Sequence, residues 1–165
     1  MKTRYLLLSW LAVLAVFAAT AWLYPGLPER IPVHWNVDGE IDRYGARAMI
    51  FMMPALMAAI LALLSLLPRF DPQRFRTSES GDTYWFSALV VSGLLGYIQV
   101  LLLWGATGEG VDLRRALIGG IAVFLALLGN VMGKVRRNFW VGVRTPWTLA
   151  NERVWYATHR LAAKT

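Results

Sequence analysis

The sequence contains no cysteine. Disulfide bonds and thiol-based metal or redox sites are therefore excluded by composition alone. Charged residues are also scarce: they make up 16% of the chain, whereas they account for about a quarter of a soluble domain. Hydrophobic residues reach 57%. A chain with this composition is expected to be an integral membrane protein.

Acidic residues are few as well, with 10 Asp and Glu against 17 Lys and Arg, for a net charge of +7. An excess of cations can indicate nucleic-acid binding. Here, however, the cations stand beside hydrophobic segments, which is the pattern of cytosolic loops in membrane proteins. We therefore expect no nucleic-acid partner.

A helix needs about 20 residues to cross a bilayer. Hydrophobic segments of about this length occur at residues 5–24, 48–67, 84–107 and 116–132. The first also has features of a cleavable signal peptide. Its apolar run exceeds the ~7–15 residues of that class, so we interpret it as a retained span. The predicted fold is an all-α integral membrane bundle of four transmembrane helices, in which Gln99 of the third span is a packing residue.

The spans pair into two helical hairpins, residues 1–67 with an extracytoplasmic loop at 25–47, and residues 84–165. With both termini in the cytosol, twelve of the 17 cations lie on the cytosolic side, which the positive-inside rule favours. The five cations left outside are Arg30, Arg43, Arg47, Arg114 and Arg115. We predict a multi-pass protein of the cell membrane with cytoplasmic N- and C-termini.

The loop at 25–47 contains Asp38-Gly39 between two short extended stretches, a signal for a two-stranded hairpin. We expect this hairpin to lie on the outer membrane surface. His34 and Trp35 are candidate ligand-binding residues, because imidazole and indole combine contact area with a polar atom.

The same loop gathers His34 and several carboxylates, the ligand types that a hard cation accepts. The chain has no H-E-x-x-H motif and no EF-hand spacing, so we predict no metal site and interpret the carboxylates as solvated charges and turn formers. Those carboxylates are Glu29, Asp38, Glu40 and Asp42.

The end of the fourth span carries a dense set of polar residues. At 3.6 residues per turn, Asn130, Lys134, Arg137 and Asn138 share one sector, which predicts a polar stripe on a helix that continues past the span. Asn130, Lys134 and Asn138 are candidate ligand- or partner-binding residues. Arg144 is another, because a guanidinium at a turn suits a carboxylate or a phosphate. Alternatively, the cations only mark topology and the asparagines join helices.

Thr145-Pro146 has the form of an N-cap followed by proline at the first helical position, which predicts a helix to about residue 164. This helix is amphipathic and is expected to lie in the inner membrane interface, with His159 on its solvated side. Its basic, aromatic surface fits anionic lipids or an acidic cytosolic protein. The residues predicted to dock it on the bundle are Trp147, Asn151, Trp155 and Thr158.

Two stretches carry a resemblance to a known family. The first reads N-x-x-G-K-x-x-x-N followed by G-V-R-T-P-W-T-L-x-N-x-x-V-W-x-x-T-H-R, within residues 129–160, and resembles the C-terminal signature of the SdpI family. The second, YPGLPERIPVHWNVDGEIDRYGAR at residues 24–47, is similar to the domain that commonly precedes that signature. Longer members carry more spans, so this chain looks like a short form.

The resemblance implies an immunity or resistance protein of the bacterial cell membrane whose partner is a secreted peptide toxin, with signalling to a cytosolic partner as an additional role. Catalytic triads, phosphate loops and metal motifs are absent from the sequence, so we predict no catalytic residues and no cofactor. Two alternatives stay open. One is a small transporter or lipid-handling protein, for which Gln99 and Asn130 would supply polar groups; the other is a membrane-embedded metal-dependent enzyme that uses His34.

Overall fold

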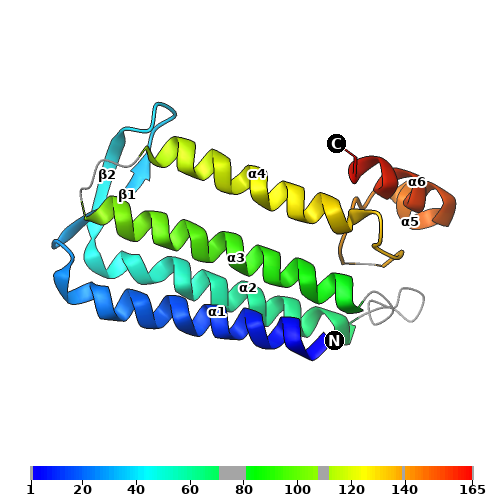
Figure 1. Ribbon diagram of the computed structural model, residues 1–165, viewed down its shortest axis with the longest axis horizontal. Helices are drawn as coiled ribbons and strands as arrows, with labels where there is room; N and C mark the ends of the chain where they lie inside the picture. The colour runs from blue at the N-terminus through cyan, green and yellow to red at the C-terminus, as the bar shows by residue number, and fades with distance from the viewer. Residues whose placement is uncertain (1, 71–80, 108–111, 139, 165) are drawn as a thin grey trace.

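The computed structural model describes residues 2–70, 81–107, 112–138 and 140–164. Its long helices are α1 (Lys2–Leu23), α2 (Met52–Leu66), α3 (Gly81–Ala106) and α4 (Leu113–Met132), which run side by side along the molecule (Figure 1). Short 3-10 turns at Arg47–Phe51 and Leu67–Phe70 extend α2 at both ends. All four helical segments are long and apolar enough to cross a membrane, which confirms the predicted spans of a multi-pass membrane protein.

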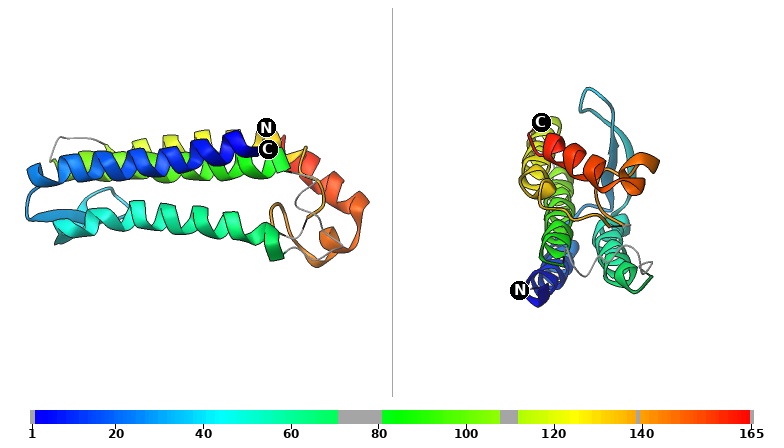
Figure 2. Two further views of the ribbon diagram at one scale, coloured as in Figure 1. Left: turned by 90° about the horizontal axis from the view of Figure 1, so that it is seen from below. Right: turned by 90° about the vertical axis from the view of Figure 1, so that its right-hand side faces the viewer.

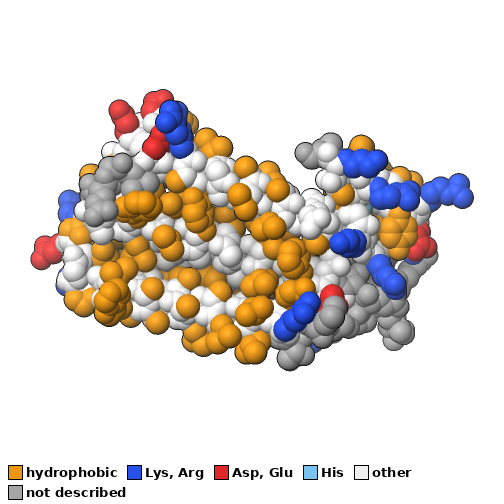
Figure 3. Space-filling model, in the orientation of Figure 1, with side chains coloured by type: hydrophobic (Ala, Val, Ile, Leu, Met, Phe, Trp, Pro, Cys, Tyr) orange, Lys and Arg blue, Asp and Glu red, His pale blue; other side chains and the backbone are white. Residues whose placement is uncertain are grey.

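α3 is the central helix of the bundle. It packs against α1, α2 and α4, while α4 has its main contacts with α3 and with the C-terminal helix α6 (Glu152–Ala162). Seen along the bundle, α1, α3 and α4 form a row and α2 lies beside it (Figure 2). On the face seen in Figure 3, hydrophobic side chains cover the helices, as contact with lipid requires.

α1, α2 and α3 pack closely at mid-height. Val13, Met57 and Leu61 are buried together there. At Gly96 of α3, an added Cβ would lie 3.3 Å from a methyl group of Val16, so the absence of a side chain lets α1 and α3 approach. Hydroxyl groups within these helices donate to the carbonyl four residues earlier, which satisfies them without water.

A buried amide joins three elements near one end of the bundle. Gln99 is 1% exposed, and its Nε2 donates to Oγ1 of Thr20 (3.1 Å) and to the carbonyl of Ile50 (3.2 Å). In a regular helix that carbonyl would accept from the N–H of residue 54, but Pro54 has none. The hydroxyl of Thr20 donates its hydrogen to the carbonyl of Val16, so its oxygen must be the acceptor for Gln99. Gln99 therefore supplies the donor that Pro54 lacks.

The predicted hairpin is confirmed at the same end of the bundle. β1 (Arg30–Trp35) pairs antiparallel with β2 (Ile41–Ala46). In the turn, Oδ1 of Asn36 accepts from two backbone N–H groups and Gly39 has a φ of +85°, in the left-handed region that favours glycine. Ile31 of β1 is buried in a cluster with side chains of the helix ends, so the hairpin is part of the core.

Two predictions about the C-terminal quarter are wrong. α4 ends at Met132 and the chain leaves the helix at Gly133, so the polar residues that follow do not form a stripe on one helix face. The predicted last helix is two helices, α5 (Pro146–Ala150) and α6, because Asn151 between them has extended backbone angles (φ −131°, ψ 119°).

Candidate functional site

The residues after α4 fold into a compact unit, which we call the C-terminal cap (residues 134–164). Trp155 of α6 is completely buried in it, and its Nε1 donates to the carbonyl of Val135 (2.9 Å). The indole stacks on the ring of His159, with 4.1 Å between centroids. α6 thus turns its Trp155 side toward the segment that leaves α4, and its own contacts with α4 hold the cap to the end of the bundle.

His159 is buried at the centre of the cap, so the prediction that it is solvated is wrong. Its Nδ1 donates to the carbonyl of Trp155 (2.8 Å) and its Nε2 accepts from the N–H of Val143 (3.0 Å). Only the neutral ring with hydrogen on Nδ1 can make both bonds. Burial lowers the pKa of His159, an effect that outweighs the opposing hydrogen bond to Trp155.

Gly142 is required beside this histidine. It has a φ of +121°, and a Cβ there would overlap Nε2 of His159. A side chain at this position would therefore displace either the loop or the imidazole.

Asn138 is buried, and its side-chain amide forms hydrogen bonds with backbone groups two or three residues away. Its Oδ1 accepts from the N–H groups of Trp140 (2.9 Å) and Val141 (2.7 Å), and its Nδ2 donates to the carbonyls of Arg136 and Val141 (both 2.9 Å). These four bonds use the whole capacity of an amide. Asn138 therefore shapes the loop that carries Arg144.

α5 and α6 each begin after a residue whose side chain bonds the first backbone N–H groups of the helix. Thr145 caps α5, as predicted, through a reciprocal pair of bonds with Thr148. Asn151, predicted to dock on the bundle, is exposed and instead caps α6 through its Oδ1, which accepts from the N–H groups of Arg153 and Val154. Of the other predicted docking residues, Trp147 is 66% exposed and Thr158 is half-buried.

The remaining candidates of this end face outward. Asn130, Lys134 and Arg144 are exposed. Cations gather at this end of the molecule (Figure 3), and Glu152 is the only acidic residue in the sequence of the cap. The outer surface of the cap is therefore suited to an anionic or carbonyl-rich partner.

His34 and Trp35 lie at the opposite end, on β1. Nδ1 of His34 is 2.6 Å from Oδ1 of Asp42 across the hairpin, and both side chains are about half exposed. Within the ranges described above, no three His, Asp or Glu side chains gather as metal ligands do. Trp35 packs on the end of α3, since a Cβ at Gly105 would lie 3.3 Å from its indole. The predicted site residues therefore divide between two ends of the bundle.

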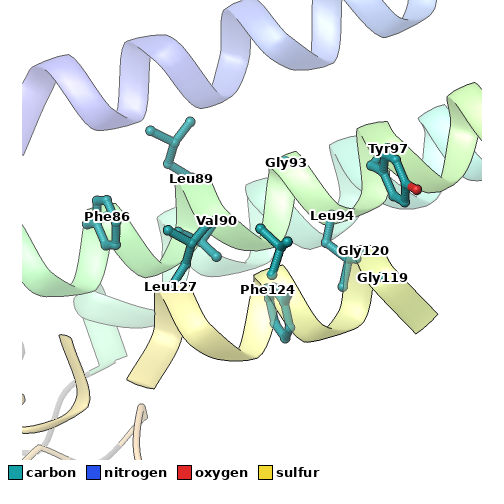
Figure 4. A pocket seen from close by; sticks show the side chains of 11 residues that line it. Phe86, Leu89, Val90, Gly93, Leu94, Tyr97, Gly119, Gly120, Phe124 and Leu127 are labelled. Carbon is teal, nitrogen blue, oxygen red and sulfur yellow. The ribbon is translucent and has the colours of Figure 1, made fainter. Parts of the chain in front are cut away.

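Among the described residues, three of the cavities border both α3 and α4. One of about 560 Å³ opens between α3 and α4 and is lined by apolar side chains and glycines of both helices (Figure 4). A second, of about 280 Å³, lies between the bundle and the Val141–Val143 segment of the cap. A third, of about 310 Å³, lies between the hairpin, α3 and α4 and has Arg114 at its wall. Sequence patterns did not indicate these cavities, because each is formed by segments distant in the chain.

Comparison with known proteins gives matches in both stretches that carried the resemblance. Residues 11–58 match the domain of unknown function DUF1648, and residues 134–165 match the SdpI/YfhL protein family. The chain is 28% identical to the immunity protein SdpI of Bacillus subtilis over 96% of its own length and 74% of that protein. It is 34% identical to an uncharacterized protein of Archaeoglobus fulgidus, over 62% of this chain and 67% of the relative. No solved structure matches the chain.

Proposed function

The chain belongs to the SdpI/YfhL protein family, and from this membership we propose that it protects bacterial cells against a secreted peptide toxin. The observation that carries the proposal is the extent of the similarity to an immunity protein, which runs through the hairpin, the spans and the cap. A shared cap alone would support only a shared fold of the C-terminus.

We place the hairpin outside the cell and the cap in the cytosol. The support is the distribution of cations along the sequence, because this topology assigns twelve of the 17 to the cytosol and five to the outside. A secreted toxin would then reach the hairpin first, where His34 and Trp35 are the proposed contact residues. The half-exposed imidazole and the indole present a polar atom and apolar area to a peptide.

The cap is the proposed second contact surface. Lys134 and Arg144 are exposed on it, and Asn130 is exposed in the last turn of α4. Their chemistry suits anionic head groups of the inner leaflet or an acidic cytosolic protein, through which binding at the membrane would be signalled inward. Asn138 contributes by holding the loop that presents Arg144.

A survival assay tests the proposal. The chain is expressed in a toxin-sensitive bacterium, and survival is measured in culture fluid that kills the unprotected host. Wild type should protect, whereas Trp35→Ala and Arg144→Lys should lose protection at normal membrane abundance. Lysine keeps the charge of Arg144 but loses the two-pronged donor. Arg153→Lys, a change at another exposed arginine of the cap, serves as the matched control. An unprotected host that contains normal amounts of wild-type protein would refute the immunity role.

A lipid-handling role is the second candidate. The observation in its favour is the apolar cavity between α3 and α4 (Figure 4), whose lining lies on membrane-spanning helices. Transfer of labelled lipid between leaflets of liposomes that contain the purified protein would support it, and the same rate in empty liposomes would count against it.

A further inference from the structure

The cavity between the hairpin, α3 and α4 differs from the other two that border α3 and α4, because it has a charged side chain at its wall. Arg114 belongs to the first turn of α4, and its Cβ would lie 3.4 Å from a Cβ built on Gly39 of the hairpin turn. The base of this arginine is therefore fixed between α4 and the hairpin. The rest of the lining is Trp35, Asn36, Val37, Gly39, Ile98, Leu101, Leu102, Leu113, Leu117, Ile118 and Ile121.

Arg114 and its neighbour Arg115 differ in their partners. Arg115 is paired, since its Nε lies 3.1 Å from Oδ2 of Asp112. Arg114 is exposed and, among the residues that the structure describes, makes neither an ion pair nor a hydrogen bond. A guanidinium whose N–H donors are available, beside an apolar cavity, matches a ligand that has both an anionic group and an apolar part.

The cavity opens sideways along a membrane-spanning helix. Ile118 and Ile121 of α4 both line it and are 62% and 40% exposed. Such side chains face hydrocarbon in a bilayer, so the opening is accessible to a lipid chain without passage through water. A peptide that arrives from the aqueous phase would approach the hairpin turn instead, where Val37 is 89% exposed.

We propose that this cavity binds an anionic phospholipid, with one acyl segment between α3 and α4 and the phosphate on the guanidinium of Arg114. The bound lipid would join the hairpin to α4 at a point where the protein itself provides few contacts. This site is independent of the immunity role, because it requires only the geometry of the cavity and the charge at its wall.

Lipid-specific quenching tests the proposal directly. Because the chain lacks cysteine, Ile118→Cys gives a single attachment point for a bimane fluorophore within the cavity lining. The labelled full chain is placed in nanodiscs of phosphatidylcholine that carry a small fraction of either brominated phosphatidylglycerol or brominated phosphatidylcholine. We expect the anionic lipid to quench about fivefold more effectively, the factor that corresponds to ~1 kcal/mol for one cation at an anionic surface.

Two variants locate the charge. Arg114→Gln should abolish the preference, whereas Arg115→Gln, which changes an arginine already paired with Asp112, should retain it. Arg114→Lys keeps a cation and should keep most of the preference, which serves as the test if the glutamine variant does not fold. Equal quenching by both lipids in the labelled chain with Arg114 intact, or a preference that survives in Arg114→Gln, would overturn the proposal. Quenching by neither lipid would also overturn it and would favour a peptide occupant.

Discussion

Replacing Gln99 with leucine should destabilise the bundle through a carbonyl on a different helix. The side-chain amide of Gln99 donates to the carbonyl of Ile50, and it is also bonded to Thr20. An interhelical hydrogen bond in a membrane contributes ~0.6–2 kcal/mol. A buried carbonyl left without a partner costs ~1–3 kcal/mol. We therefore expect Gln99→Leu to lower the free energy of unfolding by about 2 kcal/mol.

The cause can be separated from a general packing defect by a second substitution. Pro54→Ala restores the backbone N–H that would bond the carbonyl of Ile50, in the 3-10 turn before α2, so the amide of Gln99 is needed less. The double variant should therefore be more stable than the sum of the single losses predicts, by about 1 kcal/mol. The measurement is equilibrium unfolding in mixed micelles, followed by loss of helical signal.

A matched cycle provides the control. Ser92 is also buried in α3, but its hydroxyl donates to the carbonyl of Ala88 in its own helix. Ser92→Ala combined with Pro54→Ala should therefore be additive. If Gln99→Leu and Pro54→Ala are additive too, the amide does not serve the carbonyl that Pro54 leaves open, and the reasoning is refuted.

Three further predictions concern the cap and the topology. The cap should become protease-sensitive as the pH falls below 6.5, the ordinary pKa of histidine, because the pKa of His159 is lower in the closed cap than in the opened cap. Above 6.5 the imidazole is neutral in both forms, so the cap keeps its full stability. His159→Gln should remove the pH dependence. Trp155→Phe should loosen the cap by ~1 kcal/mol through loss of the indole hydrogen bond, whereas Trp147→Phe, at an exposed position, should leave proteolysis unchanged. Single cysteines at Val37 and Lys164 should be labelled by a membrane-impermeant reagent from opposite sides of the membrane, and labelling from the same side would disprove the proposed topology.

The spans and the hairpin could be predicted from the sequence because local properties determine them. A membrane helix must satisfy its backbone within one segment and present apolar side chains, so hydrophobic length locates it. The Asp38-Gly39 pair likewise indicated the turn, since Gly39 supplies the positive φ that the turn requires. The capping threonine at residue 145 belongs to the same class of local signals.

The cap could not be predicted in the same way. Its helical spacing placed His159 on a polar side, yet the histidine is buried because a backbone N–H from sixteen residues earlier reaches its Nε2. Asn138 was assigned to a helical stripe, yet its amide closes an irregular loop. The polar groups of such loops are satisfied by partners that depend on how the chain folds back, and periodicity carries no information about those partners.

The central position of α3 has a consequence for how the protein is made. α1 and α2 are synthesised first, and they leave the ribosome before the helix that packs against both of them exists. At that stage the carbonyl of Ile50 also lacks the amide of Gln99. The first two spans can then pack only against each other, and the buried faces that they present to α3 are completed only when the third span enters the bilayer.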